Sequence, residues 1–243
     1  GCTGLTSITI PDGVTSIGNA AFRNCMGLTS IKIPNSVTSI DDSVFGFCTG
    51  LTSITIPDRV TSIGKHAFSS CKALTSITIP QSVETIGEYA FANTGLTSIT
   101  IPDTVMSIGE GAFAGCADLA SVTLSEGFAD IPAYLFSDCV SLTSLTIHEV
   151  PSIGNGILNN CSSITEVTIE STYPPVIQGG DPFGYNEGAT YPIYVPSGSL
   201  SYYENDQDWQ QYTGRLQVAG GGGTQKFVKV SSTNDVTSGT YLV

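Results

Sequence analysis

"LTSITIPDGVTSIGNAAFRNC", residues 5–25, is the segment that decides the fold, because the chain repeats it. The apolar run that opens it begins eight times, at Leu5, Leu28, Leu51, Leu74, Leu96, Leu119, Leu142 and Ile164. Successive starts are 22 or 23 residues apart. A fixed period of this length predicts a solenoid, in which each copy forms one coil of a stack.

The first copy predicts how one coil folds. Ile8 and Ile10 alternate with polar residues, which is the pattern of a strand with one buried face. Pro11 ends this strand because it cannot donate to a continuing ladder. "VTSI" at 14–17 predicts a second short extended piece, and the apolar spacing within 21–25 predicts a helical or 3₁₀ turn.

Two rows of residues are expected to fill the core when the coils stack, because one coil cannot bury its own apolar edge. The rows are Phe22, Phe45, Phe68, Phe91, Phe113 and Phe136, and Cys25, Cys48, Cys71, Cys116, Cys139 and Cys161. Seven cysteines in all, an odd number, no CxxC pair and no histidine in phase argue against a metal site or a full set of disulfides. We therefore expect buried free thiols.

The charge balance of the 243-residue chain excludes two classes of partner. Only 12% of the residues are charged, and 8 basic against 21 acidic residues give a net charge of −13. Binding to nucleic acid needs clustered Lys and Arg, and so does docking to an anionic membrane. No apolar run approaches the ~20 residues of a spanning helix. We expect neither nucleic-acid binding nor membrane insertion.

The strand motif LxxIxIP is a version of the leucine-rich repeat motif, and the whole unit resembles the BspA-like leucine-rich repeats of bacterial and some protist surface proteins. The resemblance covers residues 1–172. It departs from the common motif, which has Asn or Cys where this chain has Gly13, Ser36, Arg59 and Ser82. The resemblance implies a repeat solenoid of about 23 residues per coil, with a parallel sheet on one face and short strands and helical or 3₁₀ turns on the other.

Four segments are expected along the chain, with both ends cut from a longer protein. Residues 1–172 form the solenoid of about eight coils, and residues 173–218 resemble the C-terminal cap of bacterial members of the family. Residues 219–225 are a Gly-rich linker by composition. Residues 226–243 contain two strand-like runs and are expected to begin a further β domain.

The cap is expected to continue the sheet and to cover its end. Ile193, Val195 and Pro196 repeat the pattern of Ile8, Ile10 and Pro11 and predict a ninth strand. "SLSYYENDQDWQQY" predicts helical turns that lay Tyr203, Trp209 and Tyr212 over the open end of the core. Terminal units of solenoids are atypical in this way.

No group of residues supports catalysis, a cofactor or a metal. The glycines that recur at one repeat position (Gly18, Gly64, Gly87, Gly109 and Gly154) indicate a tight corner, because no GxGxxG cluster stands before a helix. The two histidines, His66 and His148, occupy different repeat positions and have no nucleophile at a recurring offset. We expect that the protein is not an enzyme.

The positions that vary between coils are the candidates for recognition. The predicted ligand-binding residues are Lys32, Asp58, Arg59, Lys65, His66, Glu88, Tyr89 and Tyr134. Exposed tyrosine is typical of binding hot spots, although unconstrained surface would vary in the same way. The family resemblance implies a monomeric cell-surface or secreted module that binds a protein or glycan, including one from a host. The alternative is a structural spacer that presents a C-terminal domain.

Overall fold

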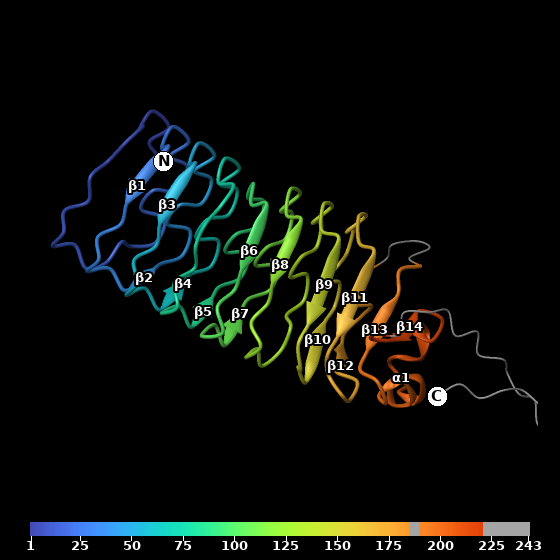
Figure 1. Cartoon of the computed structure of the whole chain (residues 1–243). Helices are drawn as coiled ribbons and strands as arrows, with labels where there is room; N and C mark the ends of the chain where they lie inside the picture. The colour runs from blue at the N-terminus through green and yellow to red at the C-terminus, as the bar shows by residue number, and fades with distance from the viewer. Residues whose placement is uncertain (185–189, 221–243) are drawn as a thin grey trace, which may run out of the picture.

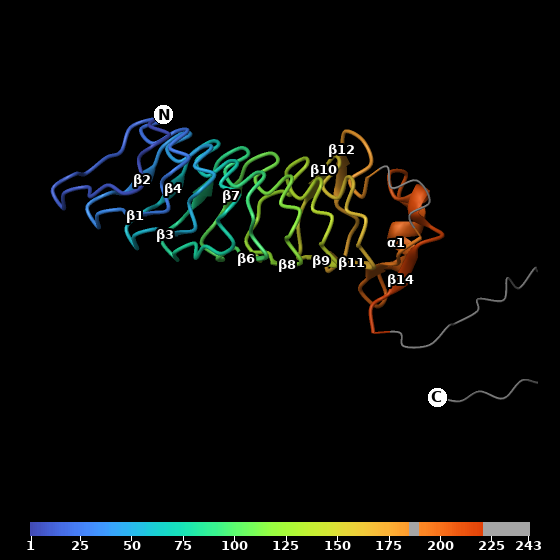
Figure 2. The ribbon, with the colours of Figure 1, turned by 90° about the horizontal axis from the view of Figure 1, so that it is seen from above.

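The coils stack along one axis from the N-terminus to a cap at the C-terminal end (Figure 1). The computed structural model describes residues 1–184 and 190–220, so the predicted β domain at 226–243 and most of the predicted linker lie outside the described residues. The strands of the coils form two rows, which lie on opposite sides of the interior (Figure 2). The predicted repeat solenoid with a period of about 23 residues is confirmed.

The first row contains strands that follow the repeat leucines, although none forms after Leu5 or Leu74, and its last two strands come from the cap. They are β1 (Ser30–Lys32), β3 (Ser53–Thr55), β6 (Ser98–Thr100), β8 (Ser121–Thr123), β9 (Ser144–Ile147), β11 (Glu166–Ile169), β13 (Ile193–Val195) and β14 (Leu216–Val218). Paired strands are parallel and one coil apart in register, so that Ile31 lies opposite Ile54. Alternate residues point into the core, as the period of two requires.

The second row contains the short strands before the glycine corner. They are β2 (Ser39–Ile40), β4 (Ser62–Ile63), β5 (Thr85–Ile86), β7 (Ser107–Ile108), β10 (Ser152–Gly154) and β12 (Val176–Gln178). The row is interrupted between β7 and β10. In regular coils the corner glycine donates its N–H to the coil before, as Gly109 does to Ile86 O at 2.8 Å. Pro132 occupies this position and has no N–H to donate.

The segment that leads back to the first row differs from the prediction, because it is neither helical nor 3₁₀. It consists of consecutive turns in which Arg23 N donates to Ala20 O at 3.0 Å. Ala20 and Asn24 have positive φ angles of 58° and 60°, which stop a helix from propagating. Other N–H groups of the segment point to the next coil, as Phe22 N does to Val44 O at 2.9 Å.

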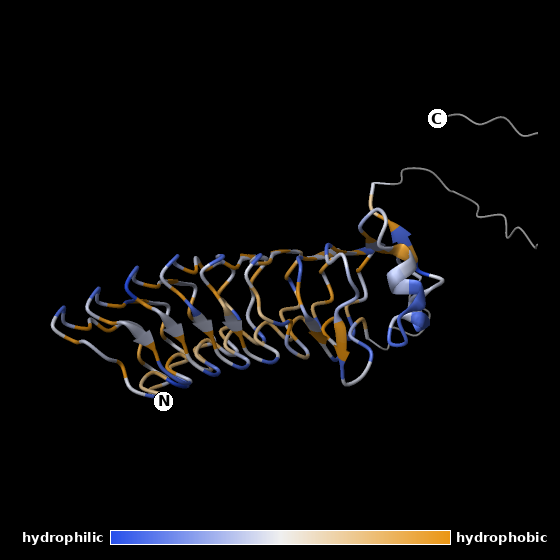
Figure 3. Cartoon of the chain, turned by 90° about the horizontal axis from the view of Figure 1, so that it is seen from below, coloured by the Kyte–Doolittle hydropathy of each residue, from blue (hydrophilic) through white to orange (hydrophobic). Residues whose placement is uncertain are grey.

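We call this side of the solenoid the turn edge. It comprises residues 19–24, 42–47, 65–70, 88–93, 110–115, 133–138 and 155–160. Its first positive-φ position recurs in every coil, at Ala20, Ser43, His66, Tyr89, Gly111, Tyr134 and Gly156. Hydrophilic residues gather at the bends of the coils, with hydrophobic segments between them (Figure 3).

The phenylalanine row forms a continuous stack through the core. Ring centroids of successive residues from Phe22 to Phe136 lie 5.2 to 5.9 Å apart, with interplanar angles of 17° or less. Phe22 is only partly buried, because a neighbouring coil packs against its ring on one side alone. Ile8 of the same coil was expected to face the core but is 39% exposed, because only one neighbouring strand flanks it.

The cysteine row runs beside the phenylalanine row. Its six members are free and buried, whereas Cys2 is free and exposed. Each thiol from the second coil onward donates to the carbonyl of a phenylalanine in the coil before, as Cys71 Sγ does to Phe45 O at 3.2 Å. Burial raises the pKa of Cys48 to about 11 and that of Cys161 to about 12, so these thiols stay protonated at neutral pH.

The cap covers the last coil with aromatic side chains. It contains α1 (Leu200–Asn205) and the 3₁₀ helix η1 (Gln210–Tyr212). Tyr203, Trp209 and Tyr212 are buried. Trp209 Nε1 donates to Pro175 O at 2.8 Å, and Tyr203 Oη donates to Ser171 O at 2.7 Å. None of the helices among the described residues is long and apolar enough to cross a membrane.

Candidate interaction surface

The turn edge brings together four of the eight predicted ligand-binding residues. Equal repeat positions in neighbouring coils lie side by side, so Lys65 meets Glu88 and His66 meets Tyr89. Lys65 Nζ lies 2.8 Å from Glu88 Oε1. The rings of His66 and Tyr89 stack, with centroids 5.4 Å apart and an interplanar angle of 7°. These side chains form one contiguous patch.

Glu110 extends this patch into the next coil, although it was not among the predicted residues. Tyr89 Oη donates to Glu110 Oε1 at 2.7 Å. This bond raises the pKa of Tyr89 to about 12, and the bond to Glu88 likewise raises the pKa of Lys65. The sequence carried a signal for Glu110, because it occupies the same repeat position as Lys65 and Glu88.

Tyr134 lies on the turn edge two coils beyond Tyr89, and Gly111 lies between them. A Cβ on Gly111 would lie 2.4 Å from Tyr89 Cε1, so the missing side chain makes room for the ring. Gly156 makes room for Tyr134 in the same way. Both tyrosines are half-buried against the coil, and the Tyr134 hydroxyl accepts a bond from Asn155 Nδ2 at 3.0 Å.

The remaining predicted residues lie on other sides of the coil. Lys32 is on β1 and points outward from the first strand row. Asp58 and Arg59 are exposed in the bend between β3 and β4, which we call the proline corner because it follows the strand proline. Equal repeat position, rather than closeness in the sequence, therefore determines which variable residues meet.

The turn edge carries charged and aromatic side chains, without a cluster of metal-ligating residues among the described residues. Within residues 1–184 and 190–220, no group of three or more His, Cys, Asp or Glu side chains could hold a metal ion. His66 stacks on a tyrosine, and His148 Nδ1 lies 2.7 Å from Glu170 Oε2 on another side of the coil. The patch offers both charges, an aromatic pair and hydroxyl groups held in fixed positions.

The repeat, the two strand rows and the stacked core define a leucine-rich repeat solenoid. The family model described as BspA type leucine rich repeat region matches residues 1–105 and 84–178, in six copies. The chain belongs to this family, as its resemblance predicted. Leucine-rich repeats generally serve as protein-interaction modules, and no catalytic family is shown for the chain. Among proteins of curated function, none matches it.

Two solved structures have the same fold. A leucine-rich repeat protein from Bacteroides ovatus is 29% identical, with 78% of this chain and 63% of that chain covered and a TM-score of 0.60. The leucine-rich repeat protein of T. pallidum is 30% identical, with 65% of this chain and 78% of that chain covered and a TM-score of 0.60. The chain thus spans less than two thirds of the Bacteroides ovatus protein.

Proposed function

We propose that this chain is an interaction or adhesion module, secreted or displayed at a cell surface, that binds a protein through the turn edge. The binding patch is formed by Lys65, His66, Glu88, Tyr89 and Glu110. The observation that carries the proposal is the unbroken series of side-chain contacts from coil to coil across this patch.

Such contacts favour binding because they hold the side chains in place before a partner arrives. Ordering a long side chain at an interface costs roughly 0.5–1.5 kcal/mol, which lowers the affinity. Here Glu88 orients Lys65. His66 and Glu110 orient Tyr89, so these side chains lose less conformational entropy when a partner binds. Tyrosine beside charged groups is also the composition of interface hot spots.

The repeat architecture supports a protein partner at this edge. Neighbouring coils place equivalent side chains in a straight row, and such rows give solenoids extended binding surfaces. The surface location rests on the family, whose members include bacterial surface proteins. The competing proposal is a spacer that presents another domain, in which the turn edge would have no ligand.

A binding screen with matched charge reversals tests the proposal. The chain would be passed over immobilised extracellular-matrix proteins and a glycan array, and each protein that binds would be titrated against variants. We expect Lys65→Glu and Tyr89→Ala to weaken binding about tenfold or more, since one such step is about 1.4 kcal/mol. Circular dichroism would confirm that the variants stay folded.

Lys32→Glu and Arg59→Glu are the controls, because they make the same charge change on other sides of the coil. Both should bind as the unchanged chain does. Loss of binding in these two variants alone would move the site away from the turn edge. Binding only to glycans would contradict a protein ligand, and no binding at all would favour the spacer.

A further inference from the structure

The bend lengths of two neighbouring coils differ from those of all the others. We measure the length of a bend from the last isoleucine or leucine of the first-row segment to the isoleucine of the second-row segment. In the regular coils this length is seven residues, as from Ile56 to Ile63. The length is six residues from Ile147 to Ile153 and eight residues from Ile169 to Ile177. Both bends nevertheless start and end in register, because Ile147 pairs with Ile169 and Ile153 pairs with Ile177. A short bend therefore lies beside a long one.

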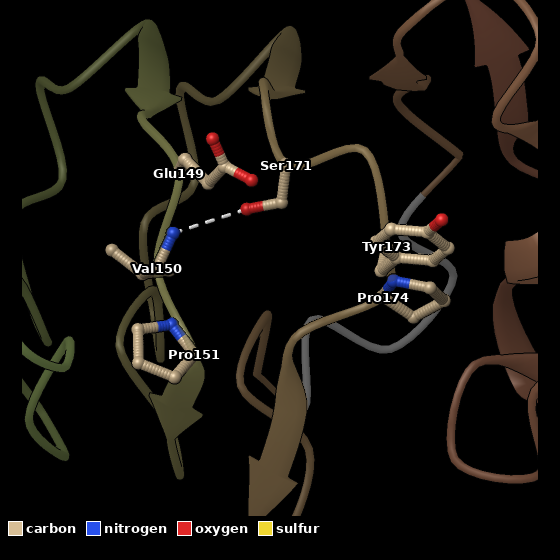
Figure 4. A pocket seen from close by; sticks show the side chains of 6 residues that line it. All are labelled: Glu149, Val150, Pro151, Ser171, Tyr173 and Pro174. Carbon is tan, nitrogen blue, oxygen red and sulfur yellow. Dashed lines mark hydrogen bonds between the residues drawn. The ribbon is translucent and has the colours of Figure 1, made fainter.

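This mismatch opens a pocket between the two bends. Its volume is about 310 Å³, and it is lined by Glu149, Val150, Pro151, Ser171, Tyr173 and Pro174. Figure 4 shows residues 149–151 on one side and Tyr173 with Pro174 on the other. Ser171 Oγ accepts a bond from Val150 N at 3.1 Å, which replaces the turn bond that the shortened bend has lost.

The cap holds the long side of the pocket in place. Tyr203 Oη donates to Ser171 O, and Trp209 Nε1 donates to Pro175 O, so both ends of the segment 171–175 are tied to buried aromatic residues. Tyr202 from α1 lies beside Tyr173, with ring centroids 5.0 Å apart. A pocket whose walls are fixed in this way is preorganised for a ligand.

The lining combines an exposed aromatic ring with a carboxylate. Tyr173 is 65% exposed and Tyr202 is 48% exposed, which is uncommon for large apolar side chains of this chain. Prolines at 151 and 174 add apolar walls. Glu149 is the charged residue of the lining, and the whole chain has a net charge of −13.

We infer that this pocket binds an arginine side chain presented by a protein partner. The guanidinium group would pair with the Glu149 carboxylate and lie over the Tyr173 ring, while the aliphatic stem contacts the prolines. Arginine combines these three properties, since its planar cation stacks on aromatic rings and is weakly hydrated. The negative charge of the chain also favours the approach of a basic partner.

The polar groups of the pocket favour a cation over a saccharide. A sugar needs donors and acceptors around several hydroxyl groups, but the Ser171 hydroxyl is occupied by Val150 N and by His148 O. What remains is one carboxylate and the hydroxyl of Tyr173. A volume near the lower end of ligand pockets, roughly 300–1,000 Å³, also suits a single side chain.

The test compares two capped amino acids that have the same shape and an uncharged backbone. Nα-acetyl-arginine amide and Nα-acetyl-citrulline amide would be titrated into the ¹⁵N-labelled chain, because citrulline keeps the shape of arginine and removes its charge. We expect saturable shifts of amide signals in 149–151 and 171–175 with arginine, at millimolar concentrations, and about tenfold weaker binding of citrulline. Glu149→Gln and Tyr173→Ala should each weaken arginine binding by a similar factor.

Asp58→Asn is the matched control. Asp58 occupies the same repeat position as Glu149 in a regular bend, so this change should not affect the titration. Equal binding of arginine and citrulline, saturable shifts with a disaccharide instead, or an unchanged affinity in Glu149→Gln would each overturn the inference. The turn-edge proposal is unaffected by these results, because it concerns another side of the coil.

Discussion

The regular coils and the last two coils are built from the same repeat but differ in the length of one bend. Up to Ile131 the bend lengths are equal, so identical residues meet and complete each other's core contacts. Beyond Ile147 the bends are six and then eight residues long, and side chains such as Tyr173 find no equivalent in the next coil. Regular spacing therefore buries equivalent side chains in a continuous core and places surface side chains in rows, whereas irregular spacing leaves some side chains without an equivalent neighbour.

The two regions also differ in how their aromatic residues pack. In the regular coils the phenylalanine rings are stacked, with one ring per coil. In the cap, Tyr203 and Trp209 meet edge to face at 4.9 Å, and Phe183 meets Tyr212 in the same manner. Stacking follows from the fixed advance between coils, whereas the cap must close a surface that no further coil covers.

Alkaline pH is expected to have the largest effect, because it acts on five thiols of the cysteine row at once. Burial raises the pKa of Cys48, Cys71, Cys116, Cys139 and Cys161 above the ordinary value of 9.0. Above pH 9 the unfolded chain loses thiol protons that the folded chain keeps, so the free energy of unfolding falls with rising pH. Each thiol contributes up to about 1.4 kcal/mol per pH unit until its folded pKa is reached.

Urea denaturation on both sides of pH 9 measures this loss, which is absent at lower pH. The double variant Cys71→Ala and Cys139→Ala should show a shallower decline, because two of the shifted groups are gone. The cap provides a comparison, since its buried Tyr203 starts from an ordinary pKa of 10.0 and should respond only at higher pH. An equal slope in the double variant would show that the thiols are not the cause.

Interruption of the phenylalanine stack is the next largest effect. Phe91 lies between Phe68 and Phe113, with centroid distances of 5.2 and 5.3 Å, and is fully buried. Phe91→Ala should lower the free energy of unfolding by about 3–5 kcal/mol, the range for a large buried aromatic residue. Phe22→Ala should cost clearly less, because Phe22 is partly exposed. Equal losses in urea denaturation would contradict the difference between the interior and the end of the stack.

Much of this core could be predicted from the sequence, because the repeat position of a residue determines its neighbours. The counterparts of Phe45 and Cys48 recur at a period of 22 or 23 residues, and both rows lie in the core. The turn segment could not be predicted, since apolar residues three apart occur both in helices and in consecutive turns. The positive φ angles of Ser43 and Phe47 have no signature in their residue types.

The candidate sites could be predicted only in part. The meeting of Lys65 with Glu88 follows from their equal repeat positions, whereas Lys32 and Arg59 occupy other positions and lie apart. The steps of 22 residues from Leu74 to Leu96 and from Leu142 to Ile164 each signalled a shortened coil. They did not tell which side of each coil was shortened, because that depends on which residues pair across the strands.

The glycine corner offers a test of intermediate size. A Cβ on Gly109 would lie 2.3 Å from Glu88 N, whereas a Cβ on Gly18 would meet no heavy atom within 4 Å. Gly109→Ala should therefore destabilise the chain by about 1–3 kcal/mol, as overpacking does. Gly18→Ala, at the same repeat position, should be neutral or stabilise by up to about 1 kcal/mol through the unfolded chain. Thermal unfolding distinguishes the two, and equal losses would mean that glycine is needed for its backbone conformation.

The smallest effect is expected where coil 4 already departs from the cysteine row. Thr94 stands in the place of cysteine, donates to Phe91 O at 2.9 Å and lies 3.1 Å from Cys116 Sγ. Thr94→Cys should change the free energy of unfolding by less than about 1.5 kcal/mol, because the thiol can bond the same carbonyl and Cys116 already donates to it.

Thiol titration gives this prediction a second readout. The variant should gain one thiol that reacts only after denaturation, and its loss of stability above pH 9 should become steeper, since one more buried thiol is present. Thr94→Val is the control, because it removes the hydroxyl without adding a thiol. A new thiol that reacts in the folded chain would show that coil 4 is less tightly closed than its regular neighbours, and would extend the irregular region into the middle of the stack.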